Sequence, residues 1–369
     1  MKSKWERKLI EDICEKASSN IAQKNLDGLS GNYPVYGASG YIQNVDFYQR
    51  DTEYIGIVKD GSGVGRVNTY PAYSSLLGTM QYILPKKGYS LQFVAYALKS
   101  LNLASFAAGA AIPHIYFRDY GKCEVSVPPL DEQQRIVAEL DLLTEVIDKR
   151  RMQLTELDTL AQSIFYDMFG DFSGTECALV ELCRSKDDIK CGPFGTQLSK
   201  SEYQSEGVAV WGIPQINSHF AIAPSDYVSD EKAVALKDYS VVSGDIVMSR
   251  KGNVGQCSVF PDSFEAGIIH SDVLRLRLDY DKANPVFMMY QLHLSDSIKH
   301  QIQLVSSGAI MPGINVTKLK NIKVLVPPLT LQQEFADKIQ SIEKQKAAVN
   351  QSIVETQKLL DYTMDKYFG

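Results

Sequence analysis

The sequence contains two copies of one unit, and the second copy follows the first at a distance of 199 residues. Val127–Arg135 is VPPLDEQQR, and Val326–Glu334 is VPPLTLQQE. In the same register GAAIP at 109–113 aligns with GAIMP at 308–312, and a later MFG aligns with the terminal YFG. Because these anchors keep one register without a gap, we interpret the chain as an internal duplication, which must be recognised before a fold is assigned.

Each copy has the same order of segments: a globular region, a short strand, PPL, and a long helix. We predict the strands at 123–127 and 322–326, which are rich in β-branched residues and end at a proline pair. Beyond PPL, apolar residues recur at steps of three, four and seven without proline or glycine, as in a coiled coil. This pattern predicts helices of about 38 residues, or about 57 Å.

The stripe on each helix needs an apolar partner, and the simplest partner is the other copy. A two-fold axis relating the copies makes the helices antiparallel, so that they form a rigid spacer. The stripe and joint residues assigned to this spacer, and to partner binding, are Gln133, Gln134, Leu140, Leu143, Ile147, Leu154 and Leu157 in the first copy and Gln332, Gln333, Ile339, Ile342 and Ile353 in the second.

The expected fold class is therefore α+β, with two mixed α/β domains joined by two long antiparallel helices in a pseudo-two-fold repeat. Short strands broken by glycine, such as YPVYGASGYIQ, EYIGIVKDGSGVGRV, GVAVWGIPQI and GDIVMSRKGNVGQCSV, favour mixed α/β domains. The predicted boundaries are 1–128 and 171–327 for the domains, with 129–170 and 328–369 for the helices.

Charge is distributed unevenly along the chain. The net charge is −6, which taken alone argues against nucleic-acid binding. The first helix region, 131–170, has nine acidic and four basic residues, and the second, 330–369, has six and five. The globular regions are neutral, with 29 residues of each sign, so the acidity belongs to the helices and the objection to DNA binding weakens.

The cellular compartment is inferred from what the sequence lacks. No apolar run approaches the ~18–20 residues that span a bilayer, and the charged N-terminal segment has no apolar signal core. The six cysteines form no C-x-x-C pair and lie at no zinc-ligand spacing with histidine. We therefore expect a cytoplasmic protein with reduced thiols and no metal site.

Two glycine-bearing loops, KDGSGVGR and SRKGNVG, carry basic residues. The first matches no nucleotide-binding glycine motif, and tight turns between strands are the simplest interpretation of the glycines. A basic loop of this kind can also approach a DNA duplex closely. With amide and aromatic residues in neighbouring segments, the candidate DNA-binding residues are Tyr36, Ser39, Tyr41, Lys59, Ser62 and Arg66 in the first domain and Phe194, Gln197, Lys200, Trp211, Gln215, Asn217, Ser249, Arg250, Lys251 and Asn253 in the second.

Catalytic motifs are missing. The chain has no G-x-S-x-G, no H-E-x-x-H and no N-P-P-[YF] motif of amino-methyltransferases, and its five histidines are scattered. We therefore predict a recognition protein that is not an enzyme and has no cofactor of its own.

The domain–helix–domain–helix order and the repeated VPPL…QQ joint resemble the specificity subunit of type I restriction–modification systems. GDIVMSRKGNVG, SSGAIMPGINVTKLKNIKVLVPPL and YPVYGASGYI also resemble the target-recognition domains of that family. The resemblance covers essentially the whole chain. It implies a non-catalytic subunit in which each domain recognises one half of a split double-stranded DNA sequence and the helices set the gap.

The resemblance also implies partners. They are two modification subunits that use S-adenosylmethionine, docked on the helices, and restriction subunits that use ATP and Mg²⁺. The first helix is more acidic than the second, so the two docking sites are not expected to be equivalent. Two rival interpretations remain: a duplicated adaptor that holds two protein partners without DNA, and, less favoured, a fused methyltransferase.

Overall fold

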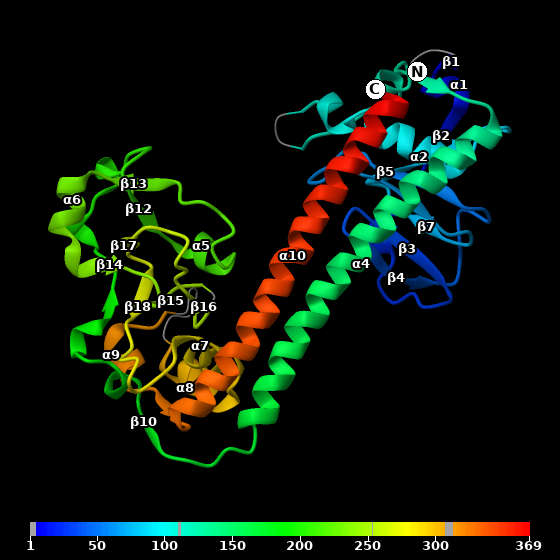
Figure 1. The fold of residues 1–369 in the computed structure, drawn as a ribbon. Helices are drawn as coiled ribbons and strands as arrows, with labels where there is room; N and C mark the ends of the chain where they lie inside the picture. Colours follow the sequence, from blue (N-terminus) through cyan, green and yellow to red (C-terminus); the bar gives the residue numbers. More distant parts are fainter. Residues whose placement is uncertain (1–4, 110–111, 253, 307–312) are drawn as a thin grey trace. The chain divides into compact units, whose positions relative to one another are not determined.

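The computed structural model describes the whole chain except residues 1–4, 110–111, 253 and 307–312. The described part divides into two compact units, 1–153 with 349–369 and 154–348 (Figure 1). Two helices of 40 residues, α4 (Leu130–Phe169) and α10 (Leu329–Phe368), contribute one part to each unit. Each unit therefore contains a globular region together with parts of both long helices. The linear boundaries at 128, 170 and 327 are not tested by this grouping and stay a prediction.

Unit 1 contains three antiparallel or mixed sheets. The strand orders are β2-β8-β5-β6, β4-β3-β7 and the ribbon β1-β9. The elements are β1 (Glu6–Leu9), α1 (Ile10–Ile13), β2 (Cys14–Ser18), η1 (Gln23–Asn25), β3 (Tyr33–Gly37), β4 (Gly40–Val45), β5 (Tyr54–Val58), β6 (Val67–Tyr70), β7 (Ser75–Leu76), β8 (Met80–Pro85), α2 (Leu91–Ser100), η2 (Leu103–Phe106), α3 (Phe117–Tyr120) and β9 (Glu124–Val127).

Unit 2 also has three sheets, in a different arrangement. The orders are β11-β18-β15-β16, β13-β12-β17-β14 and the ribbon β10-β19. The elements are β10 (Glu176–Ala178), η3 (Leu179–Leu182), η4 (Lys186–Asp188), β11 (Ile189–Cys191), η5 (Gly195–Gln197), η6 (Lys200–Glu202), β12 (Val208–Trp211), α5 (Ile213–Asn217), β13 (Asp226–Val228), α6 (Asp230–Ala235), η7 (Lys237–Tyr239), β14 (Ser240–Val241), β15 (Ile246–Ser249), β16 (Cys257–Val259), β17 (Gly267–Ile269), β18 (Val273–Leu276), α7 (Pro285–Leu294), α8 (Asp296–Val305), α9 (Val316–Lys320) and β19 (Lys323–Leu325).

The strands expected before each PPL are β9 and β19, and both are confirmed. The expected glycine-broken strands become β3, β4, β5, β6, β12, β15 and β16. One detail of that expectation is wrong, because the IPQI part of GVAVWGIPQI forms helix α5. Proline in the first turn of α5 explains this, since its fixed φ suits a helix start and its missing N–H costs nothing there.

The long helices pack against each other in opposite directions, as the two-fold relation of the copies predicts. In unit 1 the start of α4 lies beside the end of α10, and in unit 2 the end of α4 lies beside the start of α10 (Figure 1). The stripe residues are buried or half-buried; those below 9% exposure are Leu140, Ile147, Leu157, Ile339 and Ile342, and those of intermediate exposure are Leu143, Leu154 and Ile353.

Each globular core includes the far end of the helix that the other copy supplies. Tyr367 belongs to the main core of unit 1, with Met364 and Phe368 packed against it. In unit 2 the rings of Phe165 and Phe169 pack on α7. Neither domain therefore completes its core from its own linear segment. None of the helices in the described part of the chain is long and apolar enough to cross a membrane.

Candidate functional site

The repeated joint is built around one buried glutamine in each copy. Gln133 accepts a hydrogen bond from the Ser90 backbone N–H (2.9 Å) and donates one to the Pro128 carbonyl (3.0 Å). Gln332 accepts from Asn284 N–H (2.9 Å) and donates to the Pro327 carbonyl (2.8 Å).

Ser90 and Asn284 are the N-caps of α2 and α7, so each glutamine ties the start of a long helix to the start of a short one. Buried polar groups need such partners, and the joint is therefore structural. The neighbouring Gln134 and Gln333 are exposed, and partner binding by them stays a prediction.

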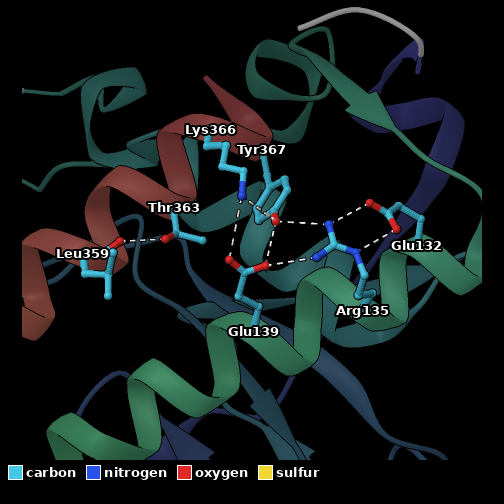
Figure 2. Close-up of polar contacts among 7 residues, drawn as sticks. All are labelled: Glu132, Arg135, Glu139, Leu359, Thr363, Lys366 and Tyr367. Carbon is cyan, nitrogen blue, oxygen red and sulfur yellow. Dashed lines mark hydrogen bonds and ion pairs between the residues drawn. The ribbon is translucent and has the colours of Figure 1, made fainter. Parts of the chain in front are cut away.

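In unit 1 the helix pair is joined by a polar network (Figure 2). Arg135 donates to both Glu132 carboxylate oxygens at 2.8 Å, to Glu139 at 3.2 Å and to the Tyr367 hydroxyl at 3.1 Å. The Tyr367 hydroxyl donates to Glu139 at 2.6 Å, and Lys366 lies 3.8 Å from the Glu139 carboxylate.

These contacts perturb the ionisable groups of the network. The hydrogen bonds with Glu132 and Tyr367 raise the pKa of Arg135, and the hydrogen bond with Arg135 lowers the pKa of Glu132. The hydrogen bond with Tyr367 raises the pKa of Lys366. Because several of these side chains are exposed, solvent screens the network, and its contribution is to orientation more than to stability.

In unit 2 the helix pair is joined by aromatic rings. Phe335 lies 5.7 Å from Phe165, 5.6 Å from Phe169 and 5.2 Å from Tyr290, measured between ring centroids. Burial raises the pKa of Tyr290 to about 12, so that ring stays neutral. Lys346 adds an ion pair to Asp158 at 2.9 Å.

The first glycine loop lies between β5 and β6. Arg66 is folded back over the loop, with Nε donating to the Gly63 carbonyl (3.2 Å) and Nη2 to the Ser62 carbonyl (3.4 Å). Gly63 has φ +89°, and a Cβ there would lie 2.0 Å from the guanidinium. Only glycine therefore allows this position of Arg66.

The repeated GAAIP segment supports this loop, a function that the sequence did not suggest. Ile115 N–H donates to the Lys59 carbonyl (3.0 Å), and Gly61 N–H donates to the Pro113 carbonyl (3.0 Å). The His114 ring also hydrogen-bonds the Asp60 carboxylate. The loop is thus held from outside by a segment that is more than forty residues away in sequence.

Unit 2 repeats the same support. Ile314, which aligns with Ile115 in the repeat, donates its N–H to the Arg250 carbonyl at 3.1 Å. GAIMP itself lies outside the described residues, but Gly313 and Ile314, which follow it directly, are described. The signal that could have revealed this contact is the presence of GA-x-x-P in both copies in strict register.

The cations of the second loop are engaged within the protein. Arg250 Nη1 donates to the Cys191 sulfur (2.9 Å) and the Ser271 carbonyl (3.3 Å). Lys251 forms an ion pair with Asp272 at 2.7 Å. Burial raises the pKa of the Cys191 thiol, which stays protonated beside the guanidinium. In the first loop Lys59 is likewise 3.9 Å from Asp60.

Three candidate DNA-binding residues need correction. Trp211 is 2% exposed in an aromatic core, and Gln215 is 5% exposed with its amide bonded to Gly212 and Ala223. Ser249 is fully buried, and its hydroxyl donates to the Lys251 carbonyl. These three side chains are buried and bonded or packed within unit 2, so we assign them to the core rather than to direct DNA contact.

The remaining candidates are accessible to different degrees, and DNA contact by them stays a prediction. Ser39, Ser62 and Arg66 come together around one hollow. Gln197 is exposed and donates to the Tyr239 hydroxyl. Asn253 lies outside the described residues. The other exposed or partly exposed candidates are Tyr36, Tyr41, Phe194, Lys200 and Asn217.

Comparison with known proteins gives one consistent result. The family described as "Type I restriction modification DNA specificity domain" matches residues 2–157 and 188–356. The chain is 24% identical over 377 residues to the type I restriction enzyme MjaVIII specificity subunit of Methanocaldococcus jannaschii, covering 92% of this chain and 86% of that protein. It is 23% identical to a putative type I restriction enzyme specificity subunit of Haemophilus influenzae, over 90% of this chain and 87% of that protein.

Solved structures share the fold. A type I restriction–modification S subunit from M. genitalium matches with a TM-score of 0.61 at 17% identity, covering 99% of this chain and 96% of that one. A chain from a study of complex assembly in a type I R-M system matches with a TM-score of 0.55 at 18% identity, covering 98% and 97%.

Proposed function

The chain belongs to the type I restriction–modification DNA specificity family, and from this membership we propose that it binds double-stranded DNA at a two-part target. Each unit recognises one half of the target, and the α4–α10 pair sets the gap between the halves. The chain itself carries out no chemistry and confers its sequence preference on catalytic partners.

The observation that carries this proposal is the family match to both halves of the chain, 2–157 and 188–356. The structural comparison of the units supports it. The backbone support of each glycine loop is the same, Ile115 to Lys59 and Ile314 to Arg250, while the side chains around the loops differ. A shared backbone arrangement that carries different side chains in the two units is consistent with recognition of two different half-sequences.

The partners in this proposal are two modification subunits, with restriction subunits joining the complex. The repeat supports two docking surfaces on the helices, because Leu130 and Leu160 of α4 and the aligned Leu329 and Leu359 of α10 are all exposed. S-adenosylmethionine, ATP and Mg²⁺ belong to these partners. The differing charge of the two helices makes the surfaces unequal.

A footprint of the complex with its modification subunit on DNA tests the proposal. We expect two protected sequences separated by an unspecific gap. A contiguous footprint would contradict two-part recognition, and binding of two proteins without any DNA protection would favour an adaptor instead.

The contribution of the helices is tested by inserting seven residues into each, after Gln153 in α4 and after Ala348 in α10. Seven residues are about two turns and about 10 Å, so the apolar stripe keeps its direction. We expect the gap to lengthen by about three base pairs at ~3.4 Å each, with both half-sequences unchanged. Changed half-sequences with a constant gap would refute this role of the helices.

A further inference from the structure

A hollow of about 640 Å³ lies beside the glycine loop of unit 1. Four segments line it: residues 20–23 at the start of η1, the β3–β4 turn with Ile42, the glycine loop, and residues 77–79 before β8. The polar residues among its lining are Asn20, Gln23, Ser39, Ser62, Arg66 and Thr79. The sequence pattern pointed to three of them and missed Asn20, Gln23 and Thr79.

The guanidinium of Arg66 is preorganised at this hollow. Two of its N–H groups are bonded to the Ser62 and Gly63 carbonyls, and a guanidinium has five such donors. Because the loop holds the group in place, little rotamer entropy is lost when the other donors find acceptors. A fixed guanidinium suits the paired O6 and N7 acceptors of guanine.

Two amide side chains, those of Asn20 and Gln23, lie beside Arg66 in the lining of the hollow of unit 1. Asn20 is exposed, and its carbonyl oxygen accepts a hydrogen bond from Gln49 at 3.0 Å, which fixes the orientation of its amide. Gln23 is also exposed. Amide side chains pair with the N6 and N7 groups of adenine in the major groove.

A second hollow, of about 470 Å³, lies beside the glycine loop of unit 2. Its lining combines loop residues 252 and 254–256 with residues of α7 and α8 and Ser306. It also presents one cation, Lys299, which lies 3.4 Å from the Asp296 carboxylate, and two amides, Gln256 and Gln303. Unit 1 has only the four-residue η2 at the place of the ten-residue α8, so the second set comes from a different element.

Each hollow therefore presents one cation and two amides beside its glycine loop. The elements that supply these side chains differ between the two units. The basic residues at the start of the second glycine loop are less suited to recognition. Arg250 already donates to the Cys191 sulfur, and Lys251 forms an ion pair with Asp272. Lys59 is similarly close to Asp60. Arg66 and the amides of the two hollows are better placed for a ligand, whereas Lys299 also has an acidic neighbour, Asp296.

Resting on the proposed function, we propose that each hollow is the site that recognises base edges in one half of the DNA target. Arg66, Asn20 and Gln23 serve the half recognised by unit 1, and Lys299, Gln256 and Gln303 serve the half recognised by unit 2. Lysine contacts phosphate, and the amides supply the base preference of unit 2. Two differently built hollows give two different half-sequences.

The test compares two double variants of the full chain in complex with its modification subunit, N20A/Q23A and Q256A/Q303A. A random DNA library is methylated, and the methylated sequences are determined by sequencing. N20A/Q23A is expected to lower base discrimination about tenfold or more at one or more positions of one half-site and to leave the other unchanged. Q256A/Q303A is expected to do the reverse, so each variant is the control for the other.

Thermal unfolding of both variants is measured alongside, because three of the amides are exposed and Gln256 is partly exposed, so their removal should not cost the fold. If the wild-type complex selects a two-part sequence and the variants leave both halves unchanged, or alter the same half, the assignment of the hollows is overturned. If the wild-type complex selects no two-part sequence, the proposed function itself fails. The two failures are therefore distinguishable.

Discussion

The start of α4 in unit 1 and the start of α10 in unit 2 are equivalent in the repeat, yet each is joined to its neighbouring helix by different chemistry. Arg135 and Glu139 of α4 form hydrogen bonds with Tyr367. At the aligned positions α10 has Glu334 and Lys338, which form an ion pair with each other at 3.2 Å.

Aromatic packing takes the place of that network in unit 2. Phe335 aligns with Ile136, and its ring contacts Phe165, Phe169 and Tyr290. The duplicated frame thus tolerates a polar, screened joint in one unit and a buried apolar joint in the other. Stability should therefore depend on different forces in the two units.

The largest effect is expected from Phe335→Ala. Phe335 is fully buried, and its removal leaves a cavity among the four rings that pack around it. The free energy of unfolding should fall by about 3–5 kcal/mol, measured by urea denaturation of the chain. Leu329→Ala, at an exposed position on the same helix, is the control and should cost much less. Equal losses would show that the aromatic joint is not the main link in unit 2.

Acid should weaken unit 2 through His293. Burial lowers the pKa of His293 to about 4, from an ordinary value of 6.5, and its Nε2 accepts a hydrogen bond from Cys257 N–H. The unfolded chain binds the proton first, so this contribution is complete above pH 6.5 and is lost as the pH falls toward 4, by at most about 3 kcal/mol.

His293→Gln should flatten that part of the stability–pH profile of the chain. The measurement is thermal unfolding at several pH values between 4 and 7. A profile as steep as that of the wild type would exclude His293 as its source.

The two buried glutamines offer the opposite comparison, because their contacts are the same in both units. Gln133→Ala and Gln332→Ala each leave a backbone N–H and a carbonyl without partners, and each should cost about 1–3 kcal/mol. Chemical denaturation of the two variants side by side checks this. Costs that differ widely would show that the joint is not energetically equivalent in the two copies.

The smallest effect is expected from Tyr367→Phe. The change keeps the buried ring and removes only the hydroxyl that contacts Arg135, Glu139 and Lys366. The loss should be about 1 kcal/mol or less, and it should shrink as salt is added. A loss that does not change with salt would contradict a screened network.

Much of the fold could be predicted from the sequence because its strongest signals are local and periodic. The apolar spacing of the helices and the proline pair that ends β9 and β19 each depend on neighbours within a few residues. The strict register of the repeat then required two equivalent units. Antiparallel pairing of the helices followed from two-fold symmetry.

The candidate site was harder to predict, because side chains of one type can serve opposite purposes. Trp211, Gln215 and Ser249 are in segments typical of recognition loops, yet they are buried. Arg250 is basic and next to a glycine loop, yet it bonds to Cys191. Composition and spacing do not distinguish a side chain that faces solvent from one that faces the core.

The sequence alone determined that this chain is a duplicated α+β protein with two long helices and with acidity confined to those helices, since repeat register, periodicity and charge are properties of the linear chain. Only the tertiary structure decided that the end of each long helix completes the core built by the other copy, and that Asn20 and Gln23 share a hollow with Arg66. Such contacts join segments far apart in sequence, and they depend on how whole elements pack rather than on the residues beside them.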